Sequence, residues 1–133
     1  MVGSSTEIFG SDSDSSDENI LISHNWADIR KIMWDYVGIL RSDKMLNRAY
    51  EKLNSINNEI NDFYHTHRIS HDLLELRNII DVANIITNSA IARKESRGLH
   101  YNKDYPDISN NYNESTDLNN TKKDFLMKIV SKA

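Results

Sequence analysis

Apolar residues recur every three or four positions along three stretches of this chain, and each stretch predicts an amphipathic helix. The first stretch follows Asn25, a favourable N-cap residue, so its helix is expected to begin at Trp26. Its apolar positions form one stripe, which consists of Trp26, Ile29, Ile32, Met33, Tyr36, Val37, Ile39 and Leu40. Trp34 falls outside this stripe, and Gly38 lies one turn later on the same outer side. A glycine within a helix costs roughly 1 kcal/mol relative to alanine, so Gly38 is predicted to mark a close approach.

The second stretch begins near Ser42, ends near residues 65–68 and shows the most regular apolar spacing in the chain. Its apolar residues alternate by three and four without exception, and they are Leu46, Ala49, Leu53, Ile56, Ile60 and Phe63. This alternation is the a/d pattern of a helix whose seam packs against partner helices. The remaining positions are mainly Asn, Glu, Lys and Asp, so the other faces are expected to be solvated.

The third stretch is expected to begin at Ser70 or His71 and to end near Ser96, with Gly98 as its C-terminal stop. Its main apolar residues are Leu73, Leu76, Ile79, Ile80, Val82, Ala83, Ile86, Ala90 and Ile91, while Leu74 and Ile85 lie on the opposite side. These positions cover about half of the helical circumference, which is more than one partner helix can bury. The third helix is therefore predicted to be central, with some apolar surface left over.

Together the three stretches predict an all-α fold, an antiparallel three-helix bundle over residues 20–107. Residues 1–19 are rich in Ser, Asp and Glu and are expected to form a disordered acidic lead-in, followed by a short extended piece at residues 20–22. Residues 108–133 are expected to form an extended tail with a linker. That tail carries a short last helix in which the apolar residues are Phe125, Leu126, Ile129 and Val130.

Composition excludes several classes of protein. The 133 residues suffice for one domain, and 16 basic against 20 acidic residues give a net charge of −4, which argues against a nucleic-acid binder. No run approaches ~18 apolar residues and no secretory signal pattern is present, so a cytoplasmic protein without membrane attachment is expected. The absence of cysteine excludes disulfides and Cys-based zinc sites. The four glycines lack the spacing of dinucleotide or P-loop motifs, so no cofactor site is predicted in this chain.

Two groups of polar residues could carry chemistry but favour simpler interpretations. His65, His67 and His71 have a spacing found among metal ligands, yet they straddle a predicted helix end and have only Asp72 nearby. They are interpreted as exposed polar residues, and no metal site is predicted. Asp72, Glu75 and Arg77 resemble helix-surface charges, because acid–base catalysis by paired carboxylates needs a pocket. No catalytic residue is predicted.

The densest polar and aromatic cluster runs from Glu95 to Pro106, just beyond the third predicted helix. Its anchor-type side chains are Arg97, His100, Tyr101, Asp104 and Tyr105. Two interpretations stay open on the residues alone. The cluster is either an interface for another protein surface, which favours arginine and aromatic residues, or a structured extension that folds back on the bundle.

This cluster also carries a family resemblance. The run Glu95-Ser96-Arg97-Gly98-Leu99-His100-Tyr101, followed by Asp104-Tyr105-Pro106, resembles the C-terminal signature of the L-aspartate oxidases, relatives of the succinate dehydrogenase and fumarate reductase flavoproteins. Three further segments fit in the same order: His24-Asn25-Trp26, then Met33 to Ile39, and then Leu73 to Asn78. The similarity covers about residues 19–107.

The resemblance implies a C-terminal three-helix domain of an enzyme that uses FAD to oxidise L-aspartate to iminoaspartate, with oxygen or fumarate as electron acceptor. This is the first step of quinolinate and NAD biosynthesis. In that family the FAD-binding and capping domains lie upstream and hold the flavin- and substrate-binding residues, so none can be carried over. By itself this chain is predicted to be inactive and to support those domains, its expected partners in cis or in trans.

The resemblance adds a docking prediction to the residue pattern. The docking surface is expected to include Trp34, Gly38, Arg97, His100, Tyr101, Asp104 and Tyr105. An excised domain, one half of a split gene and a remnant all fit this sequence. A rival interpretation is a free-standing helical interaction module that uses the same face for another partner.

Overall fold

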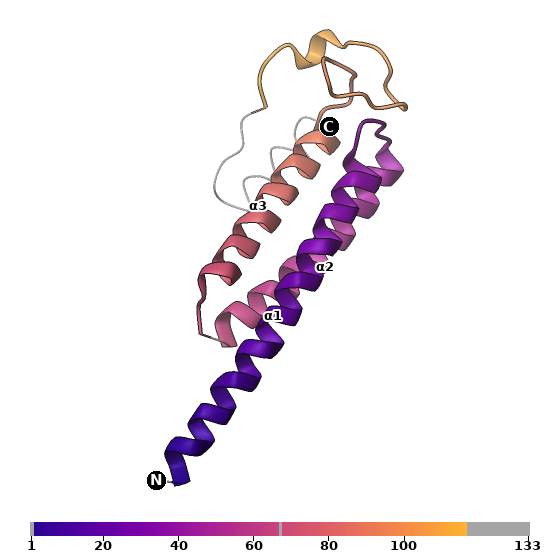
Figure 1. The fold of residues 1–133 in the computed structure, drawn as a ribbon. Coiled ribbons are helices and arrows are strands. Elements are labelled where there is room, and N and C mark those ends of the chain that lie inside the picture. Colours follow the sequence, from indigo (N-terminus) through magenta and orange to yellow (C-terminus); the bar gives the residue numbers. More distant parts are fainter. Residues whose placement is uncertain (1, 67, 117–133) are drawn as a thin grey trace.

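The chain folds into three long helices, as the computed structural model, which describes residues 2–66 and 68–116, shows (Figure 1). Helix α1 spans Val2–Val37, α2 spans Asp43–Thr66 and α3 spans His71–Ala92, and a short 3-10 helix, η1, spans Asn110–Tyr112. Successive long helices run in opposite directions and are joined by short connections. The predicted all-α antiparallel three-helix bundle is therefore confirmed. Among the described residues, bridges between backbone segments are isolated and form no sheet.

The core follows the apolar spacing of α2 most closely. Leu46, Ala49, Leu53, Ile56 and Ile60 are all buried, and Phe63 is partly buried against them. The seam packs against Ile29, Ile32 and Val37 of α1 and against Leu73, Leu76, Ile80, Ala83 and Ala90 of α3. Helix α3 packs on both other helices and leaves apolar surface exposed, as predicted, but α1 and α2 also contact each other, so α3 is not more central than they are. Val82 and Ile86, which were placed in its apolar face, are about half exposed.

Helix α1 begins much earlier than predicted. The chain is helical from Val2, so the prediction of a disordered lead-in over residues 1–19 and an extended piece at residues 20–22 was wrong. Asn25 lies within the helix and is buried instead of acting as the N-cap. For residues 18–25 the physical reason is tertiary packing, because Ile22 is buried in the core one turn before Asn25 and Glu18 accepts a hydrogen bond from Ser70.

The starts of α2 and α3 agree with the sequence, and so does the end of α2 at Thr66. Ser42 and Ser70 cap α2 and α3, with their Oγ atoms accepting hydrogen bonds from the amides of Met45 (3.2 Å) and Leu73 (3.1 Å). Helix α3, however, ends at Ala92, four residues before the predicted end, because Arg93 leaves the helical conformation. Gly98 is not its stop. It adopts a positive φ of 59° in a separate turn between Arg97 and His100.

Two predictions concern the chain that follows the Glu95–Pro106 cluster. Helix η1 lies in the segment that was expected to be a loose linker. The predicted last helix around Phe125 to Val130 lies outside the described residues. None of the helices described is both long enough and apolar enough to cross a membrane.

Candidate domain-docking surface

Residues 93–116, here called the C-terminal tail, fold over the end of the bundle where α1 ends and α2 begins (Figure 1). Two backbone hydrogen bonds attach the tail to the α1–α2 connection. The Arg41 amide donates to the Tyr101 carbonyl at 3.1 Å, and the Lys103 amide donates to the Arg41 carbonyl at 2.8 Å. Of the two interpretations of the Glu95–Pro106 cluster, the back-folded extension therefore describes its backbone.

The tail also completes the N-terminus of α2. The Asp104 carboxylate accepts a hydrogen bond of 2.8 Å from the Asp43 amide, the first in the helix. A carboxylate at this position satisfies an amide that has no partner within the helix and interacts favourably with the helix dipole. The Asp43 carboxylate in turn accepts hydrogen bonds from the Asn102 side chain (3.1 Å) and the Tyr105 hydroxyl (2.8 Å). This bond to Asp43 raises the pKa of the Tyr105 phenol.

Ser96 and Asn102 hold the first half of the tail in shape from within. Both residues are buried, and Asn102 is completely inaccessible. The Ser96 hydroxyl accepts a hydrogen bond from the Asn102 amide at 3.0 Å and lies 2.7 Å from the Tyr105 carbonyl, to which it donates. The Asn102 side-chain oxygen accepts from the Asp104 amide at 3.0 Å. The buried polar groups of Ser96 and Asn102 are thus hydrogen-bonded within the tail, as burial requires.

Glu95 organises the second half of the tail. Its carboxylate is fully buried and accepts hydrogen bonds from Arg93 (2.6 Å), Arg97 (3.0 Å) and the Ser109 amide (2.9 Å). These donors, led by Arg97, lower the pKa of Glu95 to about 2, against the opposing effect of its burial. The same two arginines also donate to η1 and its neighbours, including the Tyr112 carbonyl.

His100 joins the C-terminal ends of α1 and α3. One ring nitrogen, Nδ1, lies 2.9 Å from Nη1 of Arg41, and the other, Nε2, lies 2.8 Å from the Arg93 carbonyl. Because an arginine can only donate and a carbonyl can only accept, Nδ1 must be the acceptor and Nε2 must carry the proton. Arg41 also donates through Nε to the Val37 carbonyl at 3.1 Å, where α1 ends. Arg41 and the Arg93 carbonyl thus fix the orientation of the His100 ring.

Apolar side chains remain exposed around this internally bonded tail. Leu99, at the tip of the Gly98 turn, is completely exposed, and Tyr101 beside it is partly exposed. Ile39 and Leu40, in the connection to which the tail is bonded, are 89% and 56% exposed. Trp34, one turn before the end of α1, is 80% exposed. These five residues are here called the apical surface. The sequence predicted only Trp34 and Tyr101 among them, because periodicity assigned Ile39 and Leu40 to the core stripe.

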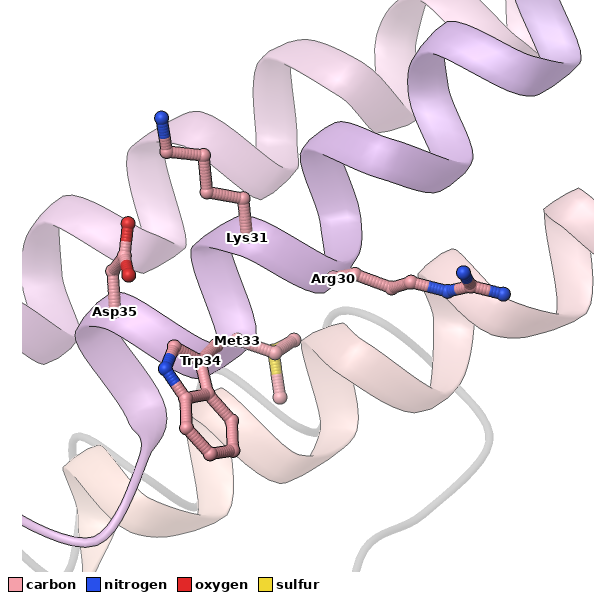
Figure 2. A pocket seen from close by; sticks show the side chains of 5 residues that line it. All are labelled: Arg30, Lys31, Met33, Trp34 and Asp35. Atoms are coloured by element: carbon pink, nitrogen blue, oxygen red, sulfur yellow. The ribbon is translucent and has the colours of Figure 1, made fainter.

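Trp34 borders an open hollow on the outer side of α1, which is lined by Arg30, Lys31, Met33, Trp34 and Asp35 (Figure 2). Lys31 and Asp35 lie on one side of the helix, and Arg30 and Met33 extend from the other side toward α3. The Met33 sulfur lies 3.7 Å from the hydroxyl of Thr87 in α3. Trp34 lies between these two sides, and its side chain is largely exposed, as its position outside the core stripe predicts.

Gly38 follows the last residue of α1 and does not lie within the helix. A Cβ atom at this position would come within 2.5 Å of the Trp34 carbonyl oxygen. The close approach that the glycine permits is therefore with the backbone of its own helix. This gives Gly38 a structural role.

The other predicted docking residues are divided by the structure. Arg97, His100, Asp104 and Tyr105 use their polar groups within the chain, where they fix the tail. Tyr101 is available at the surface. Sequence reasoning gave no role to Asn102 and placed Asp43 only in the first turn of α2, where it favours the helix dipole. It did not connect Asp43 with the tail, because hydrogen bonds between residues about 60 positions apart leave no local pattern.

The histidine-rich run shows ordinary surface contacts. His71 pairs with Glu75 at 3.1 Å on the first turns of α3, and His65 lies edge-on to Tyr64 in α2. Within residues 2–66 and 68–116, no group of three or more His, Asp or Glu side chains is arranged to hold a metal ion.

Comparison with known proteins places this fold in a family. Residues 26–130 match the family described as fumarate reductase flavoprotein C-term, which is most of the chain and includes all of α2, α3 and the C-terminal tail. The chain belongs to this family. The resemblance that the sequence motifs indicated is thereby confirmed.

Individual relatives define the branch. The chain is 54% identical over 94 residues to L-aspartate oxidase of Yersinia pestis, a match that covers 71% of this chain and 18% of the relative. It is 52% identical over 93 residues to L-aspartate oxidase of Pseudomonas aeruginosa, covering 70% and 17%. An uncharacterized FAD-dependent oxidoreductase of Methanocaldococcus jannaschii is 43% identical over 81 residues, covering 60% and 15%. The chain thus spans less than a fifth of the length of these relatives.

Proposed function

We propose that this chain is the helical C-terminal domain of an L-aspartate oxidase-type flavoenzyme and that its apical surface docks on the FAD-binding and capping domains. The observation that carries this proposal is the exposure of Trp34, Ile39, Leu40, Leu99 and Tyr101. These residues lie near the end of α1, in the α1–α2 connection and in the part of the tail that is hydrogen-bonded to this connection. Apolar side chains gathered at one end of a small domain are characteristic of an interaction surface. Family membership suggests which partner this surface contacts, because the relatives extend far beyond the matched segment and their remaining domains are available to cover it.

The polar network of the C-terminal tail supports this role indirectly. Ser96 and Asn102 are hydrogen-bonded across the segment that displays Leu99 and Tyr101, and Asp43 accepts hydrogen bonds from Asn102 and Tyr105. A surface that is fixed before association loses less conformational entropy on binding than a mobile one. Arg97, His100, Asp104 and Tyr105 therefore serve docking by positioning the surface, whereas Trp34, Leu99 and Tyr101 would touch the partner.

The chemistry of the complete enzyme would come from the partner domains. Oxidation of L-aspartate to iminoaspartate, the step that starts quinolinate and NAD biosynthesis in the cytoplasm, requires the flavin that those domains bind. This chain offers no glycine-rich phosphate cradle, and it is expected to be isolated without flavin and without aspartate oxidation. A yellow preparation of this chain alone, with stoichiometric FAD, would contradict the proposal.

Co-expression tests the assignment. This chain would be produced together with the Yersinia pestis relative truncated before its matched C-terminal segment, and the complex would be isolated through a tag on the relative. We expect co-purification, retention of FAD and aspartate-dependent formation of hydrogen peroxide. The relative's own C-terminal segment, supplied in the same way, shows whether the truncated partner is competent. If that segment restores activity and this chain neither associates nor restores it, the proposal is wrong and the free-standing module is favoured.

Variants locate the docking surface within the same experiment. Trp34→Ala and Leu99→Ser should reduce co-purification while leaving the helical content of this chain unchanged, since both side chains are exposed. Ile20→Ala provides the matched control, because Ile20 is also an exposed apolar residue of α1 but lies about 21 Å along the helix from Trp34. Equal loss in all three variants would show that the apical surface has no special role.

A further inference from the structure

The outer side of α3 exposes a second apolar surface, separate from the apical one. Leu74, Val82, Ile85 and Ile86 are 41–51% exposed and are here called the outer α3 face. From Leu74 to Ile86 they extend over about 18 Å of helix. The core positions of α3, such as Leu76 and Ile80, lie on the opposite side and are fully buried. Four large apolar side chains along one helix are more than a lone solvated helix face normally carries.

The described chain ends beside one end of this face. Arg93, which follows α3, donates through Nη2 to the Glu114 carbonyl at 2.7 Å and to the Thr116 hydroxyl at 3.3 Å. Thr116 is thereby held near the C-terminal end of α3, about 10 Å along the helix axis from Ile86. The chain that follows Thr116 therefore starts close to the outer α3 face.

The sequence beyond Thr116 has the length and pattern to cover that face. Residues 117–120 can span up to about 13 Å when extended. Phe125, Leu126, Ile129 and Val130 then recur at helical spacing after Thr121, a residue suited to an N-cap. A helix over residues 121–130 would be about 15 Å long, close to the length of the outer α3 face. The family match also extends to residue 130, which includes this segment in the domain.

Charge on the two surfaces is complementary. The exposed residues beside the outer α3 face include Asp72, Glu75 and Asp81. The segment 117–133 carries four lysines at positions 122, 123, 128 and 132 against two aspartates at positions 117 and 124. The acidic residues beside the outer α3 face and the lysines of the segment 117–133 attract each other, and this attraction favours packing of the segment on α3 over packing of another acidic surface there.

We propose that residues 121–130 pack as a fourth, amphipathic helix on the outer α3 face, antiparallel to α3, and complete the domain. The occupant is this chain's own C-terminal segment, placed by the Arg93–Thr116 contact, by its reach and by its charge. This inference does not depend on which enzyme the domain serves. It also separates the two exposed apolar surfaces, since one is covered within the chain and the other is left for the partner domains.

A spin label tests the placement in the full chain. The chain contains no cysteine, so Lys128→Cys provides a single attachment site for a nitroxide. We expect the amide NMR signals of residues 74–86 to lose intensity relative to the reduced label, while those of the α1 residues 29–34 keep theirs. Uniform signals throughout α3, or losses centred on α1 or α2, would overturn the proposal.

Two controls distinguish the alternatives. In a sample that mixes isotope-labelled chains without nitroxide and unlabelled chains with nitroxide, losses on α3 would mean that a second copy covers the face, which also overturns the proposal. Ile85→Asp should restore the α3 signals in the spin-labelled chain, and Ser23→Asp, an equal change of charge at an exposed position of α1, should not. Ile129→Asp makes the same test from the segment itself, so the result does not depend on how α3 tolerates a substitution.

Discussion

The Tyr105 hydroxyl donates a hydrogen bond of 2.8 Å to Oδ2 of Asp43, a residue 62 positions earlier in the chain. The bond joins the C-terminal tail to the first turn of α2. The other oxygen of the same carboxylate accepts from Asn102. Asp43 is therefore one of the residues that attach the tail to the bundle, together with Arg41. The bond from Tyr105 can be tested by itself.

Tyr105→Phe should lower the unfolding free energy at neutral pH, because Asp43 loses one of its two donors while the ring is kept. The bond to Asp43 raises the pKa of Tyr105 above its ordinary value of 10.0, so the folded state holds the phenolic proton more tightly than the unfolded state. Its stabilisation is thus fully present below pH 10 and is lost as the pH rises through the raised pKa. Urea unfolding of both proteins between pH 7 and 11 measures this. Tyr101→Phe is the control, since no carboxylate among the described residues accepts a hydrogen bond from that hydroxyl. An equal effect of both changes would contradict the assignment.

Glu95→Gln should remove a component of acid sensitivity. In the folded chain Arg97, Arg93 and the Ser109 amide lower the pKa of Glu95 from 4.5 to about 2. The ionised carboxylate therefore stabilises the fold above pH 4.5, and this stabilisation is lost as the pH falls from there through about 2. Thermal unfolding between pH 2 and 7 should show a steeper acid-side decline for the parent than for the variant. Glu59→Gln, at an exposed position of α2, should keep the parent's slope; if Glu95→Gln keeps it too, the buried cluster does not form.

Leu53→Ala should destabilise the chain by about 2–5 kcal/mol, the usual cost of truncating a buried leucine and leaving a cavity. Leu53 is completely buried in the α2 seam. Chemical denaturation with circular dichroism detection gives the difference directly. Leu99→Ala is the matched control, because Leu99 is completely exposed and its truncation should change the unfolding free energy by less than about 0.5 kcal/mol. Similar costs for the two leucines would mean that the seam is misplaced.

Gly38→Ala should destabilise the isolated chain by about 1–3 kcal/mol, as expected for an atom forced into an occupied site. Its Cβ would meet the Trp34 carbonyl oxygen at 2.5 Å, and a backbone oxygen at the end of a helix cannot move aside easily. A thermal melt of the isolated chain is sufficient. If the variant keeps the stability of the parent but associates more weakly with the FAD-binding and capping domains, Gly38 contributes to docking instead of to the fold of this chain.

The sequence predicted the bundle well where a helix packs against two neighbouring helices. In α2 the seam from Leu46 to Ile60 is buried by two neighbours, and this double constraint leaves a strict spacing of three and four in the sequence. In α1 the cap preference of Asn25 suggested a start, yet its burial within a longer helix depends on packing that a local preference does not report.

The candidate site was less predictable, for a physical reason that the tail makes clear. Anchor-type residues such as Arg97 and Tyr105 were correctly found to be concentrated there, but the same residue types serve interfaces and internal networks alike. What decides between these roles is the position of distant partners such as Asp43. Leu99 was quoted only as part of the family motif, although its exposure is the feature that most favours docking.

The cap that Asp104 places on α2 has a consequence for the order of folding. The two residues are 61 positions apart, so a ribosome exposes all of α2 and α3 before the carboxylate that completes the start of α2 exists. Contacts between such distant residues carry a loop-closure cost and add to the delay in folding. Until the C-terminal tail emerges, the N-terminus of α2 is therefore capped by the Ser42 side chain without the Asp104 carboxylate. The tail therefore joins the bundle only after all three long helices have been synthesised, and a chain that stops before residue 104 would lack this cap on α2.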